Sequence, residues 1–482
     1  MSSDPQDLTT TRTGGRPASS GVIAGRYALS VGMPTNWPDT KGFKWTLLSN
    51  VARLESGHTP SRKHPEYWGG DVPWIGIKDA TGNHGGTLYS TLQYTNALGI
   101  ANSSARVLPK NTVCLSRTAS VGYVVAMGCP MATSQDFVNW VCSEQLDYRY
   151  LKYILLSEHE SMLRFASGTT HQTIYFPEAK AFHALLPRVE QQRKIADILQ
   201  SLDDRIALLR ETNTTLEAIA QALFKSWFVD FDPVRAKAEG RQPEGMEAPT
   251  AVLFPDNFEE SGLGLVPKGW KMSTLGAICG ANGGAIQTGP FGSQLHASDY
   301  VAEGVPVVMP KDISNRRVDA STAARVGFED VQRLARHQLR DGDIVFSRRG
   351  DVEKHALIGE AELGWLCGTG CLLVRPGSRR NVAGFLSRSL DLPHIKKWLT
   401  QHAVGATMPN LNTGILSAVP VVLPTDEVLA AFDETTIALD RRISANNAAA
   451  QTLTQLRDTL LPRLISGQLR LPETETMLEN IL

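Results

Sequence analysis

The chain has 482 residues, a formal net charge of −1, and 42% hydrophobic and 20% charged residues, which is typical of a globular protein of roughly two to four domains. No run of about 18 apolar residues occurs and the polar N-terminus lacks the apolar core of a secretory signal, so neither a membrane span nor export is predicted. The near-neutral charge argues against nonspecific coating of nucleic acid, but sequence-specific DNA binding stays open because only the surface on the duplex must be basic.

Residues 1–40, rich in Gly, Ser and Thr, are predicted to be a flexible N-terminal tail, and residues 41–187 a first α+β domain. Short apolar runs bounded by Gly, Pro and Asn predict strands at 72–77, 112–115 and 122–127. The apolar pattern from Leu146 to Leu163 predicts a helix. The six cysteines of the chain lack disulfide-framework spacing, which makes the cytoplasm the expected compartment.

Residues 188–233 are predicted to form one long helix that ends near Asp232, because a residue before proline is pushed out of the helical region. Its apolar residues alternate by four and three positions, a 3.5-residue period held for about four heptads, which is the spacing of a coiled-coil seam. The seam positions are Ile195, Leu199, Leu202, Ile206, Leu209, Asn213, Leu216, Ala220 and Leu223. Asn213 either fixes the register of the pair or faces solvent near a crossing.

Residues 234–262 are rich in Glu, Gly and Pro and are predicted to be a linker, and residues 263–424 a second α+β domain. Residues 425–470 predict a second long helix, followed by a C-terminal tail at 471–482. The seam of this helix keeps the phase of the first, and its positions are Phe432, Thr436, Leu439, Ile443, Asn446, Ala450, Leu453, Arg457 and Leu460. Pro462 is predicted to kink or break the helix before Gly467.

The two halves of the chain repeat each other at a spacing of roughly 230 to 240 residues, far longer than the repeat of a solenoid. The shared landmarks include Lys78-Asp79 with Lys311-Asp312, Ser116-Arg117 with Ser347-Arg348, Gly168 with Gly405, and Asp203 with Asp440. Each long helix must bury its apolar stripe, and the simplest partner is the other helix. We therefore expect two similar domains on an antiparallel coiled coil with an approximate two-fold axis; the alternative is that each helix packs on its own domain.

Catalytic signatures are missing from this sequence, which contains no Walker A loop, no H-E-x-x-H motif and no Asn/Asp-Pro-Pro-aromatic loop. The segment Asp351-Val352-Glu353-Lys354 resembles a nuclease carboxylate–lysine set only faintly. Cys367 and Cys371 have no second cysteine pair and are predicted to be buried thiols rather than zinc ligands. The sequence therefore predicts no catalytic centre, cofactor site or metal site.

The repeated polar loops are instead predicted to contact DNA. The candidates are Lys78, Ser116, Arg117, Thr118, Thr170 and Gln172 in the first half, and Lys311, Ser347, Arg348, Arg349, Thr407 and Asn410 in the second. An arginine on a loop that leaves a strand can reach guanine O6 and N7, an amide such as Gln172 or Asn410 can pair with adenine, and lysines suit phosphates. The alternative is an ordinary polar surface. Arg316-Arg317 and Arg379-Arg380 are predicted to be solvated, with phosphate contact as the alternative.

Four aromatic residues close the first long helix: Phe224, Trp227, Phe228 and Phe231. They form either a core that caps the coiled coil, which is the favoured alternative, or an exposed patch that docks another protein.

Residues 216–234, LEAIAQALFKSWFVDFDPV, closely resemble the central conserved region of the DNA-specificity subunits of Type I restriction–modification enzymes. Residues 236–240 and Phe254-Pro255 continue that resemblance, and residues 460–467, LLPRLISG, resemble the C-terminal conserved region of the same family. The resemblance implies two target-recognition domains, each reading one half of a bipartite site in double-stranded DNA, with the two helices as a ruler between them.

The resemblance also implies partners. Two methyltransferase subunits would dock on the helices and use S-adenosylmethionine to methylate adenine N6, and up to two restriction subunits would translocate and cleave DNA with ATP and Mg²⁺. None of that chemistry would reside in this chain, which agrees with its lack of catalytic motifs. Nothing in the family pattern explains residues 1–40.

Overall fold

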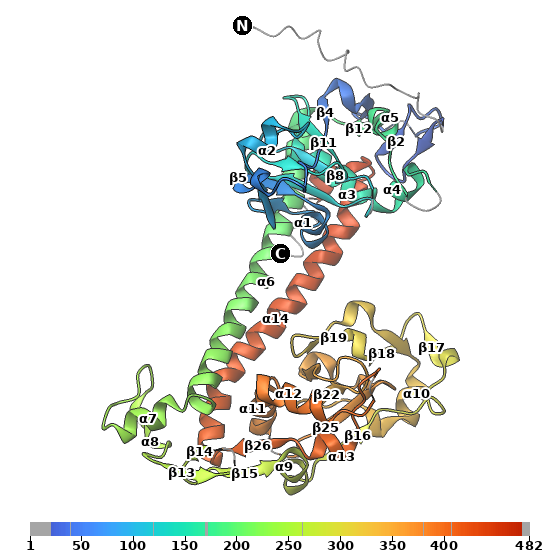
Figure 1. Ribbon diagram of the computed structural model, residues 1–482. Coiled ribbons are helices and arrows are strands. Elements are labelled where there is room, and N and C mark those ends of the chain that lie inside the picture. Colours follow the sequence, from blue (N-terminus) through green and yellow to red (C-terminus); the bar gives the residue numbers. More distant parts are fainter. Residues whose placement is uncertain are drawn as a thin grey trace. The chain divides into compact units, whose positions relative to one another are not determined.

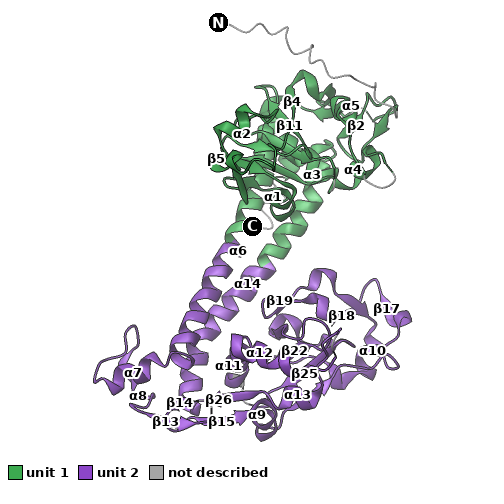
Figure 2. Ribbon diagram, in the orientation of Figure 1, with its two compact units in different colours: residues 1–208, 449–482 green, residues 209–448 purple. Residues whose placement is uncertain are grey.

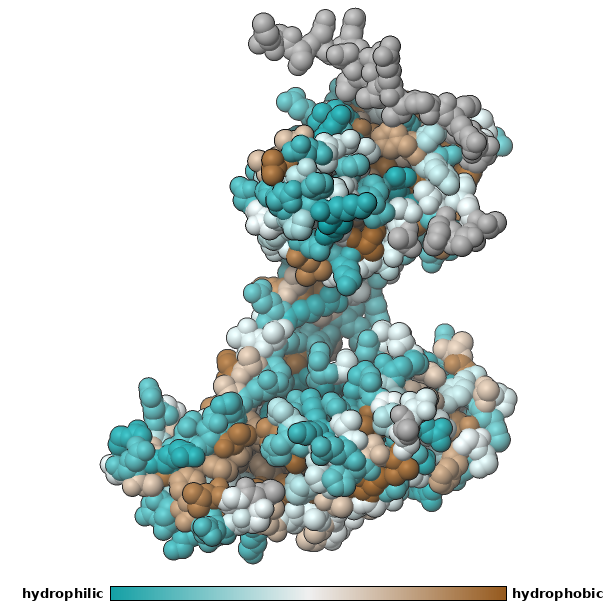
Figure 3. Space-filling model, in the orientation of Figure 1, coloured by the Kyte–Doolittle hydropathy of each residue, from teal (hydrophilic) through white to brown (hydrophobic). Residues whose placement is uncertain are grey.

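The computed structural model describes residues 21–38, 40–118, 120–168, 172–262, 264–378, 380–405 and 407–474. They divide into two compact units, one formed by residues 1–208 with 449–482 and the other by residues 209–448 (Figure 2). Two 40-residue helices, α6 (Val189–Phe228) and α14 (Asp426–Ile465), contribute to both units (Figure 1). On the face seen in Figure 3, polar and apolar residues are interspersed over both units.

The first unit holds an α+β domain built on three sheets. Their strand orders are β4 (Ala52–Ser56), β11 (Phe137–Cys142), β8 (Val113–Ser116), β9 (Val124–Met127), β6 (Thr87–Leu88); then β10 (Ala132–Thr133), β5 (Trp68–Ile75), β7 (Gln93–Thr95); then β1 (Ile23–Ala24), β2 (Leu29–Val31), β12 (Phe182–Leu186), β3 (Lys44–Leu47). The helices are α1 (Ile77–Gly82), α2 (Ala97–Ala101), α3 (Tyr148–Ser157), α4 (His159–Phe165) and α5 (Phe176–Lys180). The three predicted strands are present as β5, β8 and β9.

The second unit repeats this plan. Its strand orders are β16 (Ala285–Thr288), β25 (Cys371–Arg375), β22 (Ile344–Ser347), β23 (His355–Leu357); then β17 (Tyr300–Val301), β21 (Ala324–Val326), β18 (Val305–Val308), β24 (Leu366–Cys367); with the pairs β13 (Phe258–Ser261) and β14 (Gly264–Pro267), β15 (Lys271–Thr274) and β26 (Pro420–Leu423), β19 (Ile313–Ser314) and β20 (Arg317–Val318). The helices are α7 (Asp232–Ala238), α8 (Ala248–Val252), α9 (Leu275–Ala281), α10 (Phe328–Arg333), α11 (Arg380–Leu390), α12 (Pro393–His402) and α13 (Thr413–Ser417).

The two long helices pack as an antiparallel pair, which confirms the predicted seam. In the second unit Asn213 contacts Asn446, whereas Phe224, further along α6, contacts Phe432, which comes earlier on α14. The seam side chains are buried at both ends of the helices: Ile195 (1% exposed), Leu199 (0%), Leu202 (2%), Ile206 (3%), Phe432 (1%), Ile443 (2%), Leu453 (6%) and Leu460 (0%). The apolar stripe of α6, which repeats every 3.5 residues, therefore packs against the corresponding stripe of α14, as expected for a coiled coil.

Asn213 fixes the register of this helix pair, which decides between the two alternatives for it. Its Nδ2 donates to Asn447 Oδ1 at 2.7 Å, and Asn446 Nδ2 donates to Asn213 Oδ1 at 2.8 Å. Asn446 is only 3% exposed, so a shift of one heptad would leave its amide buried without a partner.

The N-terminal tail is shorter than predicted, because residues 23–31 are folded into the first domain. β2 pairs with β12, and Leu29 and Val31 are fully buried. The anchor is Glu158, which separates α3 from α4 and is itself fully buried. Its carboxylate accepts backbone N–H groups of Arg26 at 2.7 Å, Tyr27 at 2.6 Å and Ala28 at 2.7 Å. The single helix predicted from Leu146 to Leu163 is therefore two helices with this acceptor between them; residues 1–20 lie outside the described residues.

Four further expectations are corrected. The first long helix ends at Phe228, and the predicted linker contains α7, α8 and β13 and buries Phe254 to 2% exposure. Pro462 neither ends nor breaks α14, which continues to Ile465 because Leu460, Leu464 and Ile465 are fully buried and tertiary packing outweighs the lost backbone hydrogen bond. The predicted C-terminal tail begins with a helical stretch at 471–474, and its remainder is not among the described residues. Within the described part of the chain, no helix has the length and hydropathy needed to cross a bilayer.

Candidate nucleic-acid interface

In the first domain the structure brings two predicted loops side by side. We call the segment after β8 the arginine loop (Arg117 and Thr118) and the described residues that follow Gly168, which are Gln172 and Thr173, the glycine loop. The backbone N–H of Ile174 donates to the Arg117 carbonyl at 2.8 Å, and Thr173 Oγ1 donates to Thr118 Oγ1 at 3.2 Å. Gln172 is exposed beside this junction, and Thr170 lies outside the described residues.

The second domain has the same arrangement, with an arginine loop after β22 (Arg348 and Arg349) and a glycine loop after Gly405. The backbone N–H of Leu411 donates to the Arg348 carbonyl at 2.9 Å, and that of Gly350 donates to the Pro409 carbonyl at 3.1 Å. Arg349 and Thr407 are exposed. Each domain therefore presents an arginine next to a polar loop that follows a glycine.

Backbone pairing gives the true correspondence between the two glycine loops. Ser167 bridges to Thr173 in the first domain, and Val404 bridges to Asn410 in the second. Thr173, rather than Gln172, is thus the counterpart of Asn410, and sequence analysis missed it. The signal was available, because Thr173 and Asn410 are separated by the same interval as Gly168 and Gly405, which both have positive φ, 116° and 111°.

The two loop arginines are half-buried and oriented by the fold. Arg117 Nε donates to the Gln135 carbonyl at 3.1 Å; burial lowers the pKa of Arg117 and the nearby Asp136 raises it, but an arginine stays protonated at neutral pH. In the second domain Arg348 Nε and Asn410 Oδ1 are buried without a hydrogen-bond partner among the described residues. Such unsatisfied atoms call for an explanation, and a binding site is one.

Two predicted DNA contacts are loop-forming residues instead. Ser116 and Ser347 are fully buried. Ser116 Oγ contacts the Ser120 carbonyl and accepts the Tyr123 N–H at 2.8 Å, and Ser347 Oγ donates to the Arg349 carbonyl at 3.0 Å. A hydroxyl on the last residue of the strand satisfies the backbone of the tight loop, which explains why the serine recurs.

The two candidate lysines differ in their surroundings. Lys78 is exposed near the start of α1, whereas Lys311 Nζ lies 2.6 Å from the buried Asp312 carboxylate. Both neighbouring aspartates cap a turn, since Asp79 accepts the Gly76 N–H at 2.9 Å and Asp312 accepts the Met309 N–H at 3.0 Å. The repeated Lys-Asp landmark is thus explained by its aspartate, and Lys78 is the better placed of the two lysines for a phosphate.

The prediction that Arg316 and Arg317 are solvated is wrong. Arg316 is 7% exposed and pairs with Glu217 of α6 at 2.9 Å, and Arg317 lies 3.5 Å from Asp440 of α14. The turn between β19 and β20 has positive φ at Asn315 (47°) and Arg316 (59°), which directs both arginines at the helices. Arg379 and the side chain of Arg380 lie outside what the structure describes.

An exposed docking patch at the end of α6 is also excluded. Phe224 (4% exposed), Trp227 (6%) and Phe228 (8%) lie in the core of the second unit, and the half-buried Phe231 packs on Trp270 with ring centroids 5.6 Å apart. These aromatics pack α6 and α14 against the second domain, which agrees with the core alternative.

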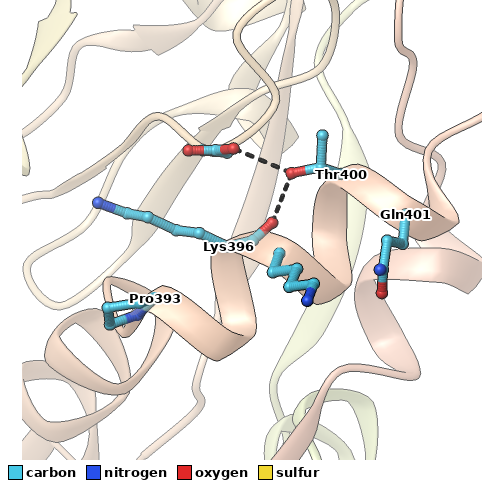
Figure 4. Close-up of a pocket in the computed structure, with 6 residues that line it drawn as sticks. Pro393, Lys396, Thr400 and Gln401 are labelled. Carbon is cyan, nitrogen blue, oxygen red and sulfur yellow. Dashed lines mark hydrogen bonds between the residues drawn. The ribbon is translucent and has the colours of Figure 1, made fainter.

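The Asp351–Lys354 segment does not assemble a nuclease site. A cavity of about 570 Å³ beside it is lined by Glu353 and by α12 residues including Lys396 and Thr400 (Figure 4). Thr400 Oγ1 donates to Glu353 at 2.9 Å, while the Asp351 carboxylate pairs with Lys354 at 2.6 Å. Among the described residues no group of three or more His, Cys, Asp or Glu side chains could hold a metal ion.

Cys367 and Cys371 are buried, as predicted for structural thiols. Burial raises the pKa of Cys367 to about 12, and it also raises that of Cys371.

Comparisons with known proteins agree with this architecture. The family model "Type I restriction modification DNA specificity domain" matches residues 41–218 and 267–446, which together make up well over half of the chain. The chain is 26% identical over 446 residues to the Type I restriction enzyme MjaIX specificity subunit of Methanocaldococcus jannaschii, covering 92% of this chain and 95% of that protein. It is 29% identical over 352 residues to the HindI specificity subunit of Haemophilus influenzae, covering 65% and 74%.

A crystal structure of a Type-I restriction-modification system S subunit from M. genitalium has a similar fold, with a TM-score of 0.55 at 16% identity over 88% of this chain and 96% of that one. Two copies of one domain, two long helices and no catalytic motif in the sequence all fit these matches. The chain therefore belongs to the family of Type I restriction–modification specificity subunits.

Proposed function

We propose that each domain of this specificity subunit reads one half of a bipartite site in double-stranded DNA. The observation that carries the proposal is the repeated junction of an arginine loop with a glycine loop, which places Arg117 beside Thr173 and Arg348 beside Asn410. Arginine and asparagine are side chains that recognise guanine and adenine edges in the major groove. The loops have one backbone plan but different side chains, so the two halves of the target would differ in sequence.

The helix pair would set the distance between the half-sites. A helix of 40 residues spans roughly 60 Å at about 1.5 Å per residue. Half-sites one duplex turn apart are separated by about 34 Å, which is within the reach of such a frame. Two recognition domains on one chain would also discriminate better than one. Each mismatched base pair costs about 1–3 kcal/mol of binding free energy, and these costs add when the mismatches are well separated.

The proposal includes partners that supply the chemistry. Two methyltransferase subunits would dock on the helices and methylate adenine N6 with S-adenosylmethionine, and up to two restriction subunits would use ATP and Mg²⁺ on unmodified DNA. The names of the relatives, which call each one a specificity subunit of a restriction enzyme, support an assembly of this kind. This chain would contribute recognition and no cofactor.

The experiment that tests the proposal is to map N6-methyladenine in a genome that carries this gene and its methyltransferase partner. A bipartite motif with a fixed spacer is expected. In a matched binding assay at elevated salt, equal retention of every duplex in a random library would refute the proposal, because phosphate contacts alone do not distinguish sequences.

Alanine at either loop arginine is expected to impair one half-site only. Arg117→Ala and Arg348→Ala should each lower the preference for the correct base by roughly 5- to 150-fold, the range of a bidentate contact with guanine, while leaving subunit assembly intact. Methylation of duplex libraries randomised in one half at a time measures this. Arg106→Ala is the control, because that exposed arginine pairs with Glu55 at 2.9 Å outside both loops. Unchanged specificity in both loop variants would count against the arginine assignment.

Lengthening the helix pair is expected to lengthen the spacer. One heptad inserted into both α6 and α14 beside the Asn213–Asn446 contact keeps the seam in phase and adds about 10 Å, or about three base pairs. The same insertion in α6 alone is the control, because it breaks the asparagine register and should disturb assembly. A normal complex with the original spacer after the double insertion would contradict the ruler model.

A further inference from the structure

The first domain carries a surface feature that lies outside its two loops. Beside β5 and β7 there is a cavity of about 380 Å³, lined by Arg62, Trp68, the Gly69-Gly70 turn, Leu92, Gln93 and Tyr94. Gly69 has a φ of 81° where β5 is irregular, and a side chain there would meet open space, whereas Gly70 packs closely against Asn96. The cavity is therefore lined by aromatic rings, an aliphatic side chain and hydrogen-bonding groups.

Arg62 is held in this cavity from two directions. Its guanidinium lies 3.9 Å from the ring centroid of Trp68 and 5.1 Å from that of Trp74, and its Nη2 donates to Gln93 Oε1 at 2.7 Å. Arginine has five N–H donors, and the structure shows no other hydrogen bond or carboxylate partner for this one within the described residues. An exposed arginine fixed in one plane loses little further freedom when it binds a planar partner.

The cavity is connected to the arginine loop through a series of hydrogen bonds within the same domain. Arg117 Nε donates to the carbonyl of Gln135, whose side chain contacts Thr59 Oγ1. Trp74 Nε1 in turn donates to the carbonyl of His58 at 3.2 Å. The segment from His58 to Arg62 therefore continues the surface on which the arginine loop lies.

Strand register shows that the paired positions described in the second domain do not repeat this arrangement. Pro73 pairs with Tyr94 in the first domain as Pro306 pairs with Arg325 in the second, so Trp74↔Gln93 corresponds to Val307↔Ala324. An alanine methyl cannot hold a guanidinium by hydrogen bonding. Two domains that share a framework differ at this position, and such differences are where different half-sites would be distinguished.

We propose that Arg62, held by Trp68 and Gln93, is a specificity-determining residue of the first domain and donates to O6 and N7 of a guanine in the first half-site. The inference rests on the proposed function and deepens it. A guanidinium held in one plane can bind either a guanine edge or a phosphate bidentately. The guanine edge is favoured because the two domains differ at this position, and only a base contact would make that difference read as sequence.

The test compares Arg62→Ala, Arg62→Lys and the matched control Lys63→Ala in complex with the methyltransferase subunits. Lys63 is the residue after Arg62 and carries an exposed charge outside the cavity. Methylation rates are measured on duplexes that vary one base at a time in both half-sites. Arg62→Ala is expected to reduce discrimination roughly 5- to 150-fold at one position of the first half-site, and Arg62→Lys should not restore it. The second half-site and the Lys63→Ala complex should keep their preferences.

Two results would overturn the inference. Uniform weakening on all sequences, with a shallower salt dependence, would identify a phosphate contact, and unchanged discrimination would show that Arg62 does not contact DNA. Thermal unfolding of each variant identifies a folding defect. Gln93→Ala provides a second variant, which removes the hydrogen bond from Arg62 but keeps the guanidinium. If the unaltered complex reads a bipartite site while Arg62 variants match it, only this inference fails; if the unaltered complex has no sequence preference, the proposed function itself fails.

Discussion

Phe228→Ala is expected to destabilise the second unit by about 3–5 kcal/mol, the range for truncating a buried phenylalanine. The ring is 8% exposed and lies among aromatic partners from two other helices and from the turn before β15. Ring centroids are 4.8 Å from Phe432 on α14, 5.0 Å from Phe385 on α11 and 5.8 Å from Trp270. Alanine would leave a cavity at the point where the helix pair meets the second domain.

Hydrogen exchange followed segment by segment measures this effect, because the chain has two units and a single global unfolding free energy is poorly defined. Amides of residues 209–448 should exchange faster, while those of the first unit serve as an internal reference. Ile219→Ala is the matched control, since Ile219 is 44% exposed on the same helix and should change stability by no more than about 0.5 kcal/mol.

The same substitution separates the core role from a docking role. Phe228→Leu keeps most of the apolar volume and should retain both the fold and the capture of the methyltransferase subunit. If Phe228→Ala instead leaves exchange unchanged but abolishes capture, the ring acts as an interface anchor and the buried arrangement is refuted.

Asp440→Ala is expected to cost the second unit about 3 kcal/mol or more, because it leaves a charge buried without its partner. The Arg388 side chain is 2% exposed, and its Nη2 donates to the two Asp440 carboxylate oxygens at 3.0 and 3.1 Å. Arg317 adds a contact at 3.5 Å. Asp440 therefore ties α11 and the β19–β20 turn to α14, which explains why an aspartate recurs here.

The counterpart in the first unit predicts a smaller effect. Asp203 accepts from Arg457 at 2.8 Å and from the Tyr153 hydroxyl at 2.7 Å. The Arg457 side chain is 28% exposed and also pairs with Asp458, so Asp203→Ala leaves a charge that water can still reach. Chemical unfolding with unit-resolved hydrogen exchange should rank Asp440→Ala above Asp203→Ala. The exposed control Asp351→Ala should cost about 1 kcal/mol or less.

A double variant checks the physical cause. Arg388→Met combined with Asp440→Leu removes both charges and keeps apolar volume, so it should recover most of the stability lost in Asp440→Ala. If the double variant is as unstable as the single one, the loss comes from packing rather than from an unpaired charge.

Much of the candidate site followed from the repeat in the sequence. Matching positions located both arginine loops and both glycine loops, and the structure brings each pair together. The sequence did not separate the residues that shape a loop from those free to contact a ligand: Ser116 and Ser347 have the polar character of a DNA contact, yet both are fully buried. The burial of a side chain depends on which distant segments pack over it. The residues next to it in the sequence do not indicate those contacts.

The sequence by itself determined the helix pair, because a 3.5-residue period is a local property and an apolar stripe of four heptads must be covered. Tertiary structure alone decided the contacts between distant segments. Glu158 anchors Arg26 across 132 residues, and Arg317 meets Asp440 across 123. The folded N-terminal strands, the buried Arg316 and the buried aromatics of α6 all depend on such contacts. Their stabilisation comes from desolvation and pairing in three dimensions, which composition and periodicity do not encode.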